Sequence, residues 1–197
     1  MRETPGQKSE REAIERQERE DDQQRWEREK YQVKQGIEKL TRKRIDKILF
    51  DTETHEWDIN TSEFGNIVEG RKDIVVMIED ERKNLFGGYI GETVQLCKAV
   101  KTDKCFVYSL RKNGIFNPKR YDVKRGETGY FINQQNNPLV MSFGLDKDDY
   151  SKDICLRKKS IGAGFTEQHA FNYKGDEYVF SGKSNFNMKR VVVYQLY

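Results

Sequence analysis

The chain changes character near residue 45, and this change constrains its fold more than any other feature of the sequence. Residues 7–44 contain no proline and a single glycine, Gly36, and are dominated by Glu, Gln, Arg and Lys, which all favour helix. After this point, short runs of β-branched and aromatic residues alternate with turn residues. The sequence therefore predicts a charged helical extension over residues 1–44 and a β-rich domain over residues 45–197.

The helical extension carries charge pairs and one short apolar stripe. Opposite charges recur four residues apart, with the acid nearer the amino terminus, which supports an isolated helix. The apolar stripe resembles a coiled-coil seam but spans fewer than three heptads, so it fits packing on the following domain or self-association through residues 26–44. The charge pairs are Glu12/Arg16, Glu15/Arg19 and Asp21/Arg25, and the stripe is Trp26, Val33, Ile37 and Leu40.

The part after residue 45 reads as many short strands with one short helix near its start. We expect the helix to begin at a capping box of Asn60 and Glu63 and to end at Gly70. Many short strands and few helices predict a mainly β (α+β) fold, a two-layer antiparallel β-sandwich with short flanking helices. Strands are expected at 47–50, 73–80, 85–91, 105–111, 119–123, 130–133, 139–143, 153–156, 177–180 and 190–197, with tight reversals at Asn113-Gly114 and Asn136-Asn137-Pro138.

Three glycines lie close together in the run NLFGGYIG at 84–91. A dinucleotide-binding fingerprint needs G-x-G-x-x-G between a strand and a helix, and a P-loop needs a lysine after its last glycine. The run has neither feature, so we expect no nucleotide site and no cofactor. Glycines inside an apolar strand instead predict a bulge or the close approach of another backbone or ring.

Several motifs, taken in order, resemble the TLDc domain. They are FGGY at 86–89, CFVYSLR at 105–111, SFG at 142–144 before an acidic loop, and FSGKSNFNMKRVVVYQLY at 180–197. The segment at 48–80 is similar to the first strand and helix of that family, so the resemblance covers residues 45–197. The motif residues singled out are Phe86, Gly87, Gly88, Tyr89, Gly144 and Gly182.

The resemblance implies a sandwich of two antiparallel sheets and a protein with no established catalytic mechanism. Members of the family are linked to resistance against oxidative stress, and some regulate the vacuolar proton-pumping ATPase. For this chain the resemblance implies a non-catalytic module that binds a protein partner, and subunits of that ATPase are the partner it suggests.

Residue types that support catalysis or metal binding are few and scattered. His55 and His169 are the only histidines, and we expect each to be bonded locally instead of serving as a general base. The cysteines and histidines show no metal-ligand spacing. The acidic loop at 146–153 lacks the central glycine and final glutamate of a calcium loop. The sequence therefore predicts neither an enzyme nor a metal site.

The three cysteines form no CxxC pair, and their odd number argues against a disulfide framework. Cys105 and Cys155 fall in strand-like runs, so we expect them to be buried. Cys97 lies beside Lys98 and outside the strongest strands, which makes it the candidate redox-sensing thiol.

Charge defines the alternative to a protein partner. The chain has a formal net charge of +3, and residues 1–44 hold 13 Lys/Arg and 11 Asp/Glu, so each part is close to neutral. Such a balance disfavours nucleic-acid binding. Two basic clusters nevertheless keep a nucleic-acid-associated regulator as the alternative. The clusters are Arg42, Lys43, Arg44 and Lys47, and Arg157, Lys158 and Lys159.

No apolar stretch approaches the roughly 18–20 residues needed to span a bilayer, and the first residues lack the apolar centre of a signal peptide. We therefore expect a soluble, cytoplasmic protein, with the nucleus as the alternative location.

Overall fold

A computed structural model describes residues 5–145, 151–159 and 163–197 of the chain. The chain divides into two compact units, Met1–Gly36 and Ile37–Tyr197. The second unit therefore includes the last turn of the amino-terminal helix as well as the β-rich region.

The amino-terminal helix, α1 (Pro5–Thr41), runs through most of the predicted extension. Within the first unit, Glu15 pairs with both Arg11 and Arg19, at 3.6 and 3.8 Å, and Lys8 lies 3.9 Å from Glu12. These exposed pairs span four residues, and each stabilises the helix by about 0.2–0.5 kcal/mol. Local charge pairing is thus a source of stability within this segment.

The end of α1 belongs to the second unit and is fixed there by specific hydrogen bonds. The Thr41 hydroxyl donates to the carbonyl of Ile37 at 2.8 Å, and the Arg120 guanidinium donates to the carbonyl of Leu40 at 3.2 Å. These bonds satisfy carbonyls that a helix end leaves open. Arg42 then stops the helix with a φ of 58°. Ile37 of the apolar stripe is buried, whereas self-association through residues 26–44 stays a prediction.

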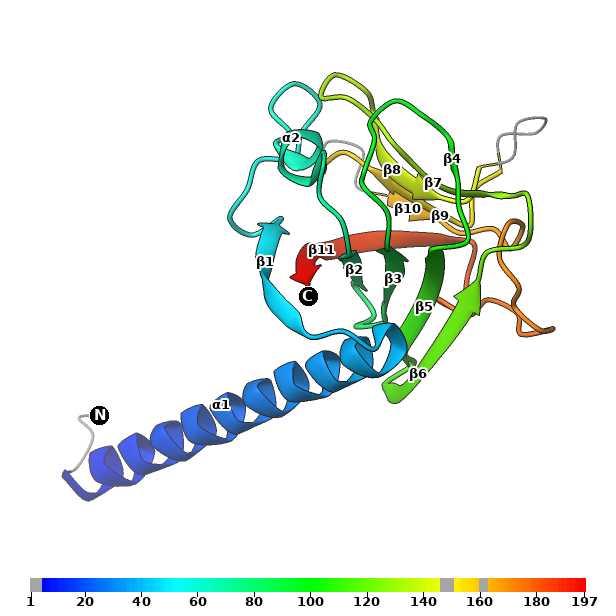
Figure 1. The fold of residues 1–197 in the computed structure, drawn as a ribbon. Helices are drawn as coiled ribbons and strands as arrows, with labels where there is room; N and C mark the ends of the chain where they lie inside the picture. The colour runs from blue at the N-terminus through cyan, green and yellow to red at the C-terminus, as the bar shows by residue number, and fades with distance from the viewer. Residues whose placement is uncertain (1–4, 146–150, 160–162) are drawn as a thin grey trace. The chain divides into compact units, whose positions relative to one another are not determined.

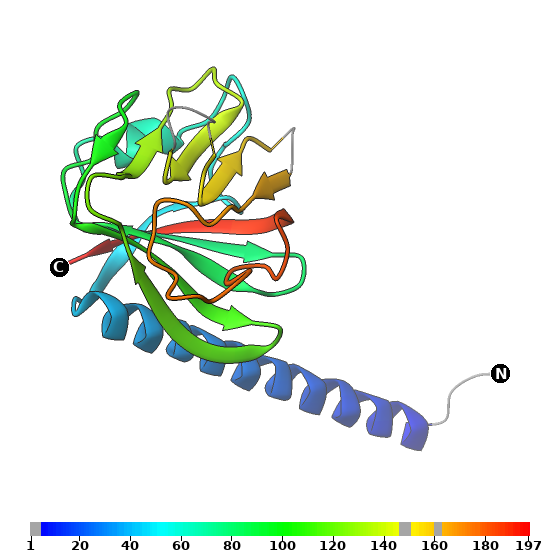
Figure 2. The same cartoon turned by 90° about the vertical axis from the view of Figure 1, so that its right-hand side faces the viewer.

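The remainder of the second unit forms two antiparallel layers that face each other (Figures 1 and 2). Sheet A has the order β1-β11-β2-β3-β5-β6, and sheet B has the order β4-β7-β8-β9-β10-β11. The predicted mainly β, two-layer antiparallel fold is confirmed. The strands are β1 (Ile45–Asp51), β2 (Ile74–Asp80), β3 (Leu85–Ile90), β4 (Val100–Lys101), β5 (Cys105–Lys112), β6 (Ile115–Asp122), β7 (Thr128–Ile132), β8 (Leu139–Phe143), β9 (Ile154–Arg157), β10 (Ala163–Phe165) and β11 (Asn185–Leu196).

The long strand β11 belongs to both sheets. Its residues 185–187 pair with β10, and its residues 192–196 pair with β1. Along its other edge β11 pairs with β2, with a register shift between Met188 and Arg190. Such a shift bends and twists a strand. The strand thereby passes from one layer to the other and joins them.

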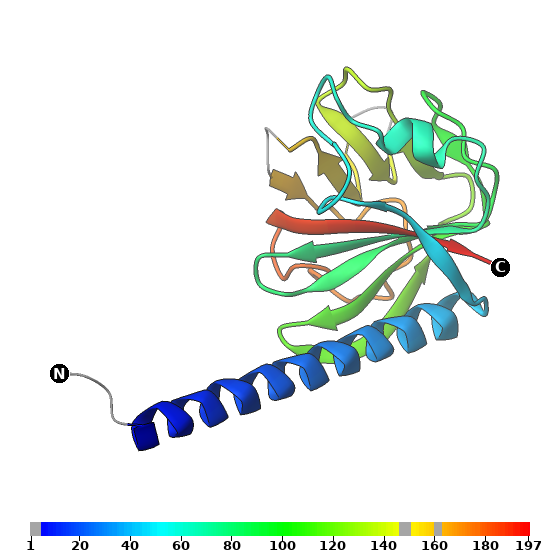
Figure 3. The ribbon, with the colours of Figure 1, turned by 90° about the vertical axis from the view of Figure 1, so that its left-hand side faces the viewer.

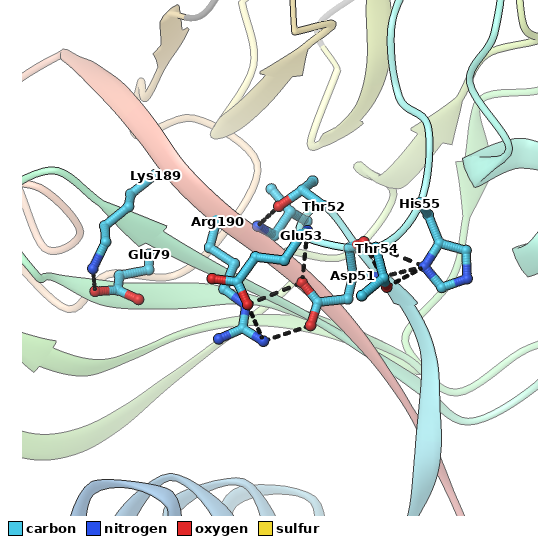
Figure 4. A network of polar contacts seen from close by, with 9 residues as sticks. Asp51, Thr52, Glu53, Thr54, His55, Glu79, Lys189 and Arg190 are labelled. Carbon is cyan, nitrogen blue, oxygen red and sulfur yellow. Dashed lines mark hydrogen bonds and ion pairs between the residues drawn. The ribbon is translucent and has the colours of Figure 1, made fainter. Parts of the chain in front are cut away.

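An ion pair fixes the pairing of β1 with β11 (Figure 4). Arg190 on β11 donates two hydrogen bonds to the Asp51 carboxylate, at 3.0 and 2.5 Å, and lies 3.0 Å from Glu53. Burial alone would raise the pKa of Asp51, but the hydrogen bond and charge of Arg190 outweigh it and hold the pKa below its ordinary value. Next to this pair, Lys189 lies 2.9 Å from Glu79.

The short helix α2 (Phe64–Val68) buries Phe64 and Val68, and the Phe64 ring meets Phe50 edge-on at 5.2 Å. Figure 3 shows α2 towards one end of the sandwich. The predicted capping box is wrong, because the N-cap is Glu63, which makes no side-chain cap; its carboxylate instead accepts a hydrogen bond from the amide of Glu56 at 3.1 Å.

Three further differences separate the structure from the sequence prediction. Residues 177–180 form no strand, because the chain turns there and Tyr178 has a φ of 48°. The strands β4 and β10 were not predicted, and they have only two and three residues.

The predicted Asn113-Gly114 reversal is confirmed, with φ values of 51° and 80° that suit a tight hairpin turn.

Candidate interaction site

Motifs that are far apart in the sequence meet in the core. Phe86 of β3 lies between Phe180 and Phe186, with ring centroids 5.4 and 5.0 Å away. The Phe86 side chain is fully buried. The FGGY and FSGKSNF motifs thus pack on each other, and this aromatic cluster underlies one end of the sandwich.

Two glycines of the FGGY motif lie where other groups approach closely. A Cβ on Gly87 would lie 1.9 Å from the carbonyl oxygen of Val76, which accepts a hydrogen bond from the Tyr108 hydroxyl at 3.0 Å. A Cβ on Gly88 would lie 2.4 Å from the ring of Phe143 in the SFG motif. Gly87 leaves room within sheet A, whereas Gly88 leaves room between the two sheets.

Tyr89, the last residue of the motif, helps to hold the chain that follows α1. Its hydroxyl donates to Asp73 at 2.5 Å, and burial together with this carboxylate raises the Tyr89 pKa above its ordinary value. Lys43 pairs with the same Asp73 at 3.3 Å. One cation of the first basic cluster therefore already has an acidic partner.

Gly144 makes room for a buried carboxylate. It has a φ of 70°, and a Cβ there would lie 2.1 Å from the carboxylate of Asp153. Asp153 accepts hydrogen bonds from the Tyr173 hydroxyl at 2.7 Å and from the amides of residues 169–171 at 2.8–3.3 Å. Burial raises the pKa of Asp153, although these donors favour the ionised form. This arrangement holds the 169–173 segment against β9.

The last motif glycine, Gly182, has a φ of 73° and lies beside the turn of the β5–β6 hairpin. A Cβ on it would lie 4.0 Å from Asn113 and 4.0 Å from Lys112. Figures 2 and 3 show the turns of the β2–β3 and β5–β6 hairpins at one end of the sandwich. We call the segments 81–84, 111–114 and 181–184 together the basic end.

Buried polar side chains hold the basic end together. Asp80 accepts hydrogen bonds from the amides of Arg82 and Asn84 and from the Asn84 side chain, at 2.8–2.9 Å. The Asn84 side chain in turn accepts a hydrogen bond from the amide of Asn113 at 2.8 Å. Arg111 donates to the carbonyl of Lys83 at 2.7 Å. The two hairpin turns are thus one connected surface.

Two hollows flank the 176–187 segment. One, of about 260 Å³, lies between the β2–β3 turn and residues 181–187, and its lining includes Arg82 and Lys183. The other, of about 300 Å³, lies between the β5–β6 hairpin and residues 176–179, and its lining includes Lys112 and Ile115. The end of the sandwich where the FGGY and FSGKSNF motifs meet therefore also has a concave surface.

The predicted basic clusters lie on different elements. Arg42 and Arg44 follow α1, and Lys47 lies on β1; these three side chains are exposed. Lys158 differs from the expected surface position, because it is buried. It follows β9 two residues after the core residue Leu156, a spacing that favours the same face of an extended chain. Burial also lowers the pKa of Lys158. In the second cluster, Arg157 lies near the Phe165 ring at 5.3 Å, and of the three residues only Lys159 is exposed.

The cysteines divide as the sequence predicts, since Cys97 is exposed and Cys105 and Cys155 are buried. Burial raises the pKa of Cys155 to about 11 and raises that of Cys105 further. His55 bonds locally through Nδ1, 3.2 Å from the amide of Asp51, and His169 lies 3.9 Å from Glu127.

The described part of the chain contains no group of three or more His, Cys, Asp or Glu side chains that could hold a metal ion. The acidic loop considered for calcium, 146–153, lies mostly outside the described residues. Among the helices of the described residues, none combines the length and apolar character needed to cross a membrane.

All five cations of the basic end were missed by the sequence reasoning, namely Arg82, Lys83, Arg111, Lys112 and Lys183. The first four stand as two adjacent pairs, each at a predicted hairpin turn. Cations at a predicted turn were the sequence signal for an exposed basic surface, but nothing in the sequence shows that the two turns lie side by side. Only the packing of the strands reveals this surface.

Comparison with family models shows that the TLDc domain model matches residues 27–197. Comparison with curated proteins gives no match. The matched range includes the whole sandwich, all the motif residues and the end of α1.

Proposed function

Because the chain belongs to the TLDc domain family, we propose that it is a non-catalytic protein-interaction module that regulates the vacuolar proton-pumping ATPase. Through that pump it contributes to resistance against oxidative stress. The family match over residues 27–197 carries the proposal. Both roles are those that the resemblance to the family implies. The protein acts in the cytoplasm, where its three thiols stay reduced.

The surface of the second unit supports an interaction role. Ile115 is 71% exposed and Tyr178 is 55% exposed, and both lie in the part of the molecule that carries the two hollows. Aromatic and large apolar residues beside cations are typical of protein interfaces. The two buried cysteines lack the accessible, low-pKa thiolate that redox chemistry requires.

A direct test uses the full chain and purified vacuolar proton-pumping ATPase in membrane vesicles. We expect the chain to co-sediment with ATPase-containing vesicles but not with matched vesicles that lack the pump, and to change ATP-driven proton uptake. Heat-denatured chain serves as the control for nonspecific sedimentation. The absence of both binding and any change in proton uptake would overturn the regulatory role.

The non-catalytic part of the proposal has its own test. The purified chain is incubated with panels of hydrolase and oxidoreductase substrates, and product formation is measured. We expect no turnover above that of the denatured chain. Turnover that a single substitution in one of the hollows abolishes would show that the protein is an enzyme.

The nucleic-acid alternative has less support from the surface. Of its seven cations, Lys43 is paired with Asp73 and Lys158 is buried. The remaining cations lie after α1, on β1 and around the end of β9, elements that belong to different parts of the fold. We therefore favour a protein partner.

A further inference from the structure

The basic end carries an amount of charge equal to the whole net charge of the second unit. Its three segments contain five Lys/Arg and one Asp/Glu, a net charge of +4. Residues 37–197 together contain 27 Lys/Arg and 23 Asp/Glu, which is also +4. The rest of this unit is therefore balanced, and the basic end is a local positive field on a neutral body.

Three cations of the basic end are available to a partner. Arg82, Lys83 and Lys183 are exposed, and their side chains make no contact with a carboxylate among the residues that the structure describes. Arg111 and Lys112 are partly buried and donate to the carbonyls of Lys83 and Glu177. The first three cations thus face solvent, whereas the other two help to build the surface.

Apolar side chains lie next to this charge. Ile115 directly follows the β5–β6 turn and lines the 300 Å³ hollow together with Val179 and the buried Tyr121. Tyr178 stands between two residues that line the same hollow. A hollow of this size has room for one large apolar side chain of a partner.

From the convergence of these charges and this hollow, we infer that the basic end docks an acidic segment of a partner protein, with one apolar side chain of that segment seated beside Ile115. Complementary charge selects the segment and speeds its encounter, and the apolar contact holds it. This inference rests on the proposed function as an interaction module and names the surface that carries it.

The neighbouring strand edge points to side-chain recognition. β6 forms the edge of sheet A, and Pro118 within it has no amide proton to donate. Lys119 and Arg120 follow on the same edge, and charged residues at an edge disfavour the addition of a further strand. The partner segment is therefore held through its side chains.

The same surface fits nucleic acid less well. Base readout and phosphate contact would leave the hollow beside Ile115 without a role. Nucleic acid is therefore the competing outcome of the test.

The test measures the binding of a fluorescent peptide in which glutamate alternates with leucine, by anisotropy with the full chain. The variant Arg82→Ser/Lys83→Asn/Lys183→Ser removes the free cations; Asn is chosen at Lys83 because the φ there is 62°. The matched control, Lys47→Ser/Arg71→Ser/Lys72→Ser, removes the same charge from exposed positions elsewhere. Unchanged circular dichroism and melting temperature verify that both variants fold.

We expect the basic-end variant to bind the peptide about tenfold more weakly, and the control variant to bind within about twofold of the natural chain. Ile115→Ser should weaken binding about fivefold for this peptide, but not for the same peptide with serine in place of leucine. Raised salt should weaken binding by the natural chain more than by the basic-end variant.

Equal losses in the basic-end and control variants would overturn the inference, as would tighter binding to a short DNA duplex than to the peptide. The pump assay separates the two proposals. If the basic-end variant still regulates the pump and binds the peptide as tightly as the natural chain, this surface is not the docking site. The proposed function is then retained. Charge-dependent peptide binding without any effect on the pump defeats the pump role alone.

Discussion

Gly87 and Gly88 are single residues on which the packing of both sheets depends. Gly87→Ala places a methyl group against the carbonyl oxygen of Val76, and Gly88→Ala places one against the ring of Phe143. We expect each change to lower the free energy of unfolding by about 1–3 kcal/mol, because the core must shift to admit the methyl group. Urea denaturation followed by fluorescence measures the loss.

Gly65→Ala is the matched control for these substitutions. It adds the same methyl group within α2, where the nearest atom would lie at an ordinary 3.4 Å. We expect its free energy of unfolding to stay within about 1 kcal/mol of the natural chain. Equal stability of all three variants would show that close approach does not govern the two strand glycines.

The thiols offer a second test at the scale of single residues. Cys97 is exposed, whereas Cys105 and Cys155 are buried and burial raises the pKa of Cys155 to about 11. We expect a thiol reagent at mildly alkaline pH to label one cysteine in the folded chain and all three in denaturant. The variant Cys97→Ser should abolish the fast reaction, and fast labelling that persists in it would contradict the assigned burial.

At the scale of elements, the pairing of β1 with β11 depends on a charged contact that pH can remove. The Asp51 pKa is lower in the folded chain than its ordinary value of 3.8. The ionised carboxylate therefore stabilises the fold above that value, and the stabilisation is lost as the pH falls through the lowered pKa. Asp51→Asn should lower the free energy of unfolding by about 1–3 kcal/mol at neutral pH.

The difference between Asp51→Asn and the natural chain should shrink as the pH falls below 3.8 and through the lowered pKa of Asp51, because Asp51 itself then becomes neutral. Urea midpoints measured across this range report the change. Glu53→Gln is the control, since Glu53 meets the same Arg190 but its side chain is 61% exposed, and its effect should stay below about 1 kcal/mol. A gap that is independent of pH would exclude a role for the Asp51 charge.

Local residue preferences and turn residues made most elements predictable from the sequence. The long charged helix, the β2–β3 pair and the Asn113-Gly114 turn follow from residue types that act locally. The elements β4 and β10 could not be predicted, because two or three residues carry no period and their strands are defined by their partners. The strand predicted at residues 177–180 was wrong for the opposite reason. Their composition is strand-like, but Val179 and Phe180 are buried in the core from a turn.

The interaction site was predictable only in part. The motif residues Phe86 and Gly182 were visible in the sequence; Phe86 packs against Phe180 and Phe186, and Gly182 lies beside the β5–β6 turn. The cations above them come from turns that are separated by about thirty residues or more, and hydrogen bonds such as that from Asn113 to Asn84 bring them together. A surface assembled from distant turns leaves no contiguous signal in a chain.

At the scale of the whole molecule, the second unit combines a neutral body with one charged end. The apolar residues between the sheets form one continuous cluster that reaches from Phe50 to Val193. Net positive charge, two hollows and the exposed Ile115 and Tyr178 instead lie at the end that the turns of sheet A and the 176–187 segment build. Stability and recognition are thus assigned to different parts of one unit.

Because β11 is common to both layers, the ribosome must deliver residues 185–196 before either layer can be completed. Until then the earlier strands have no common edge on which to assemble, and the ring of Phe86 lacks its neighbour from residue 186. A nascent chain at that stage exposes apolar surface that chaperones and proteases recognise. A premature stop codon shortly before the codon for residue 185 would therefore lead to degradation of the chain, instead of producing a stable, shorter protein.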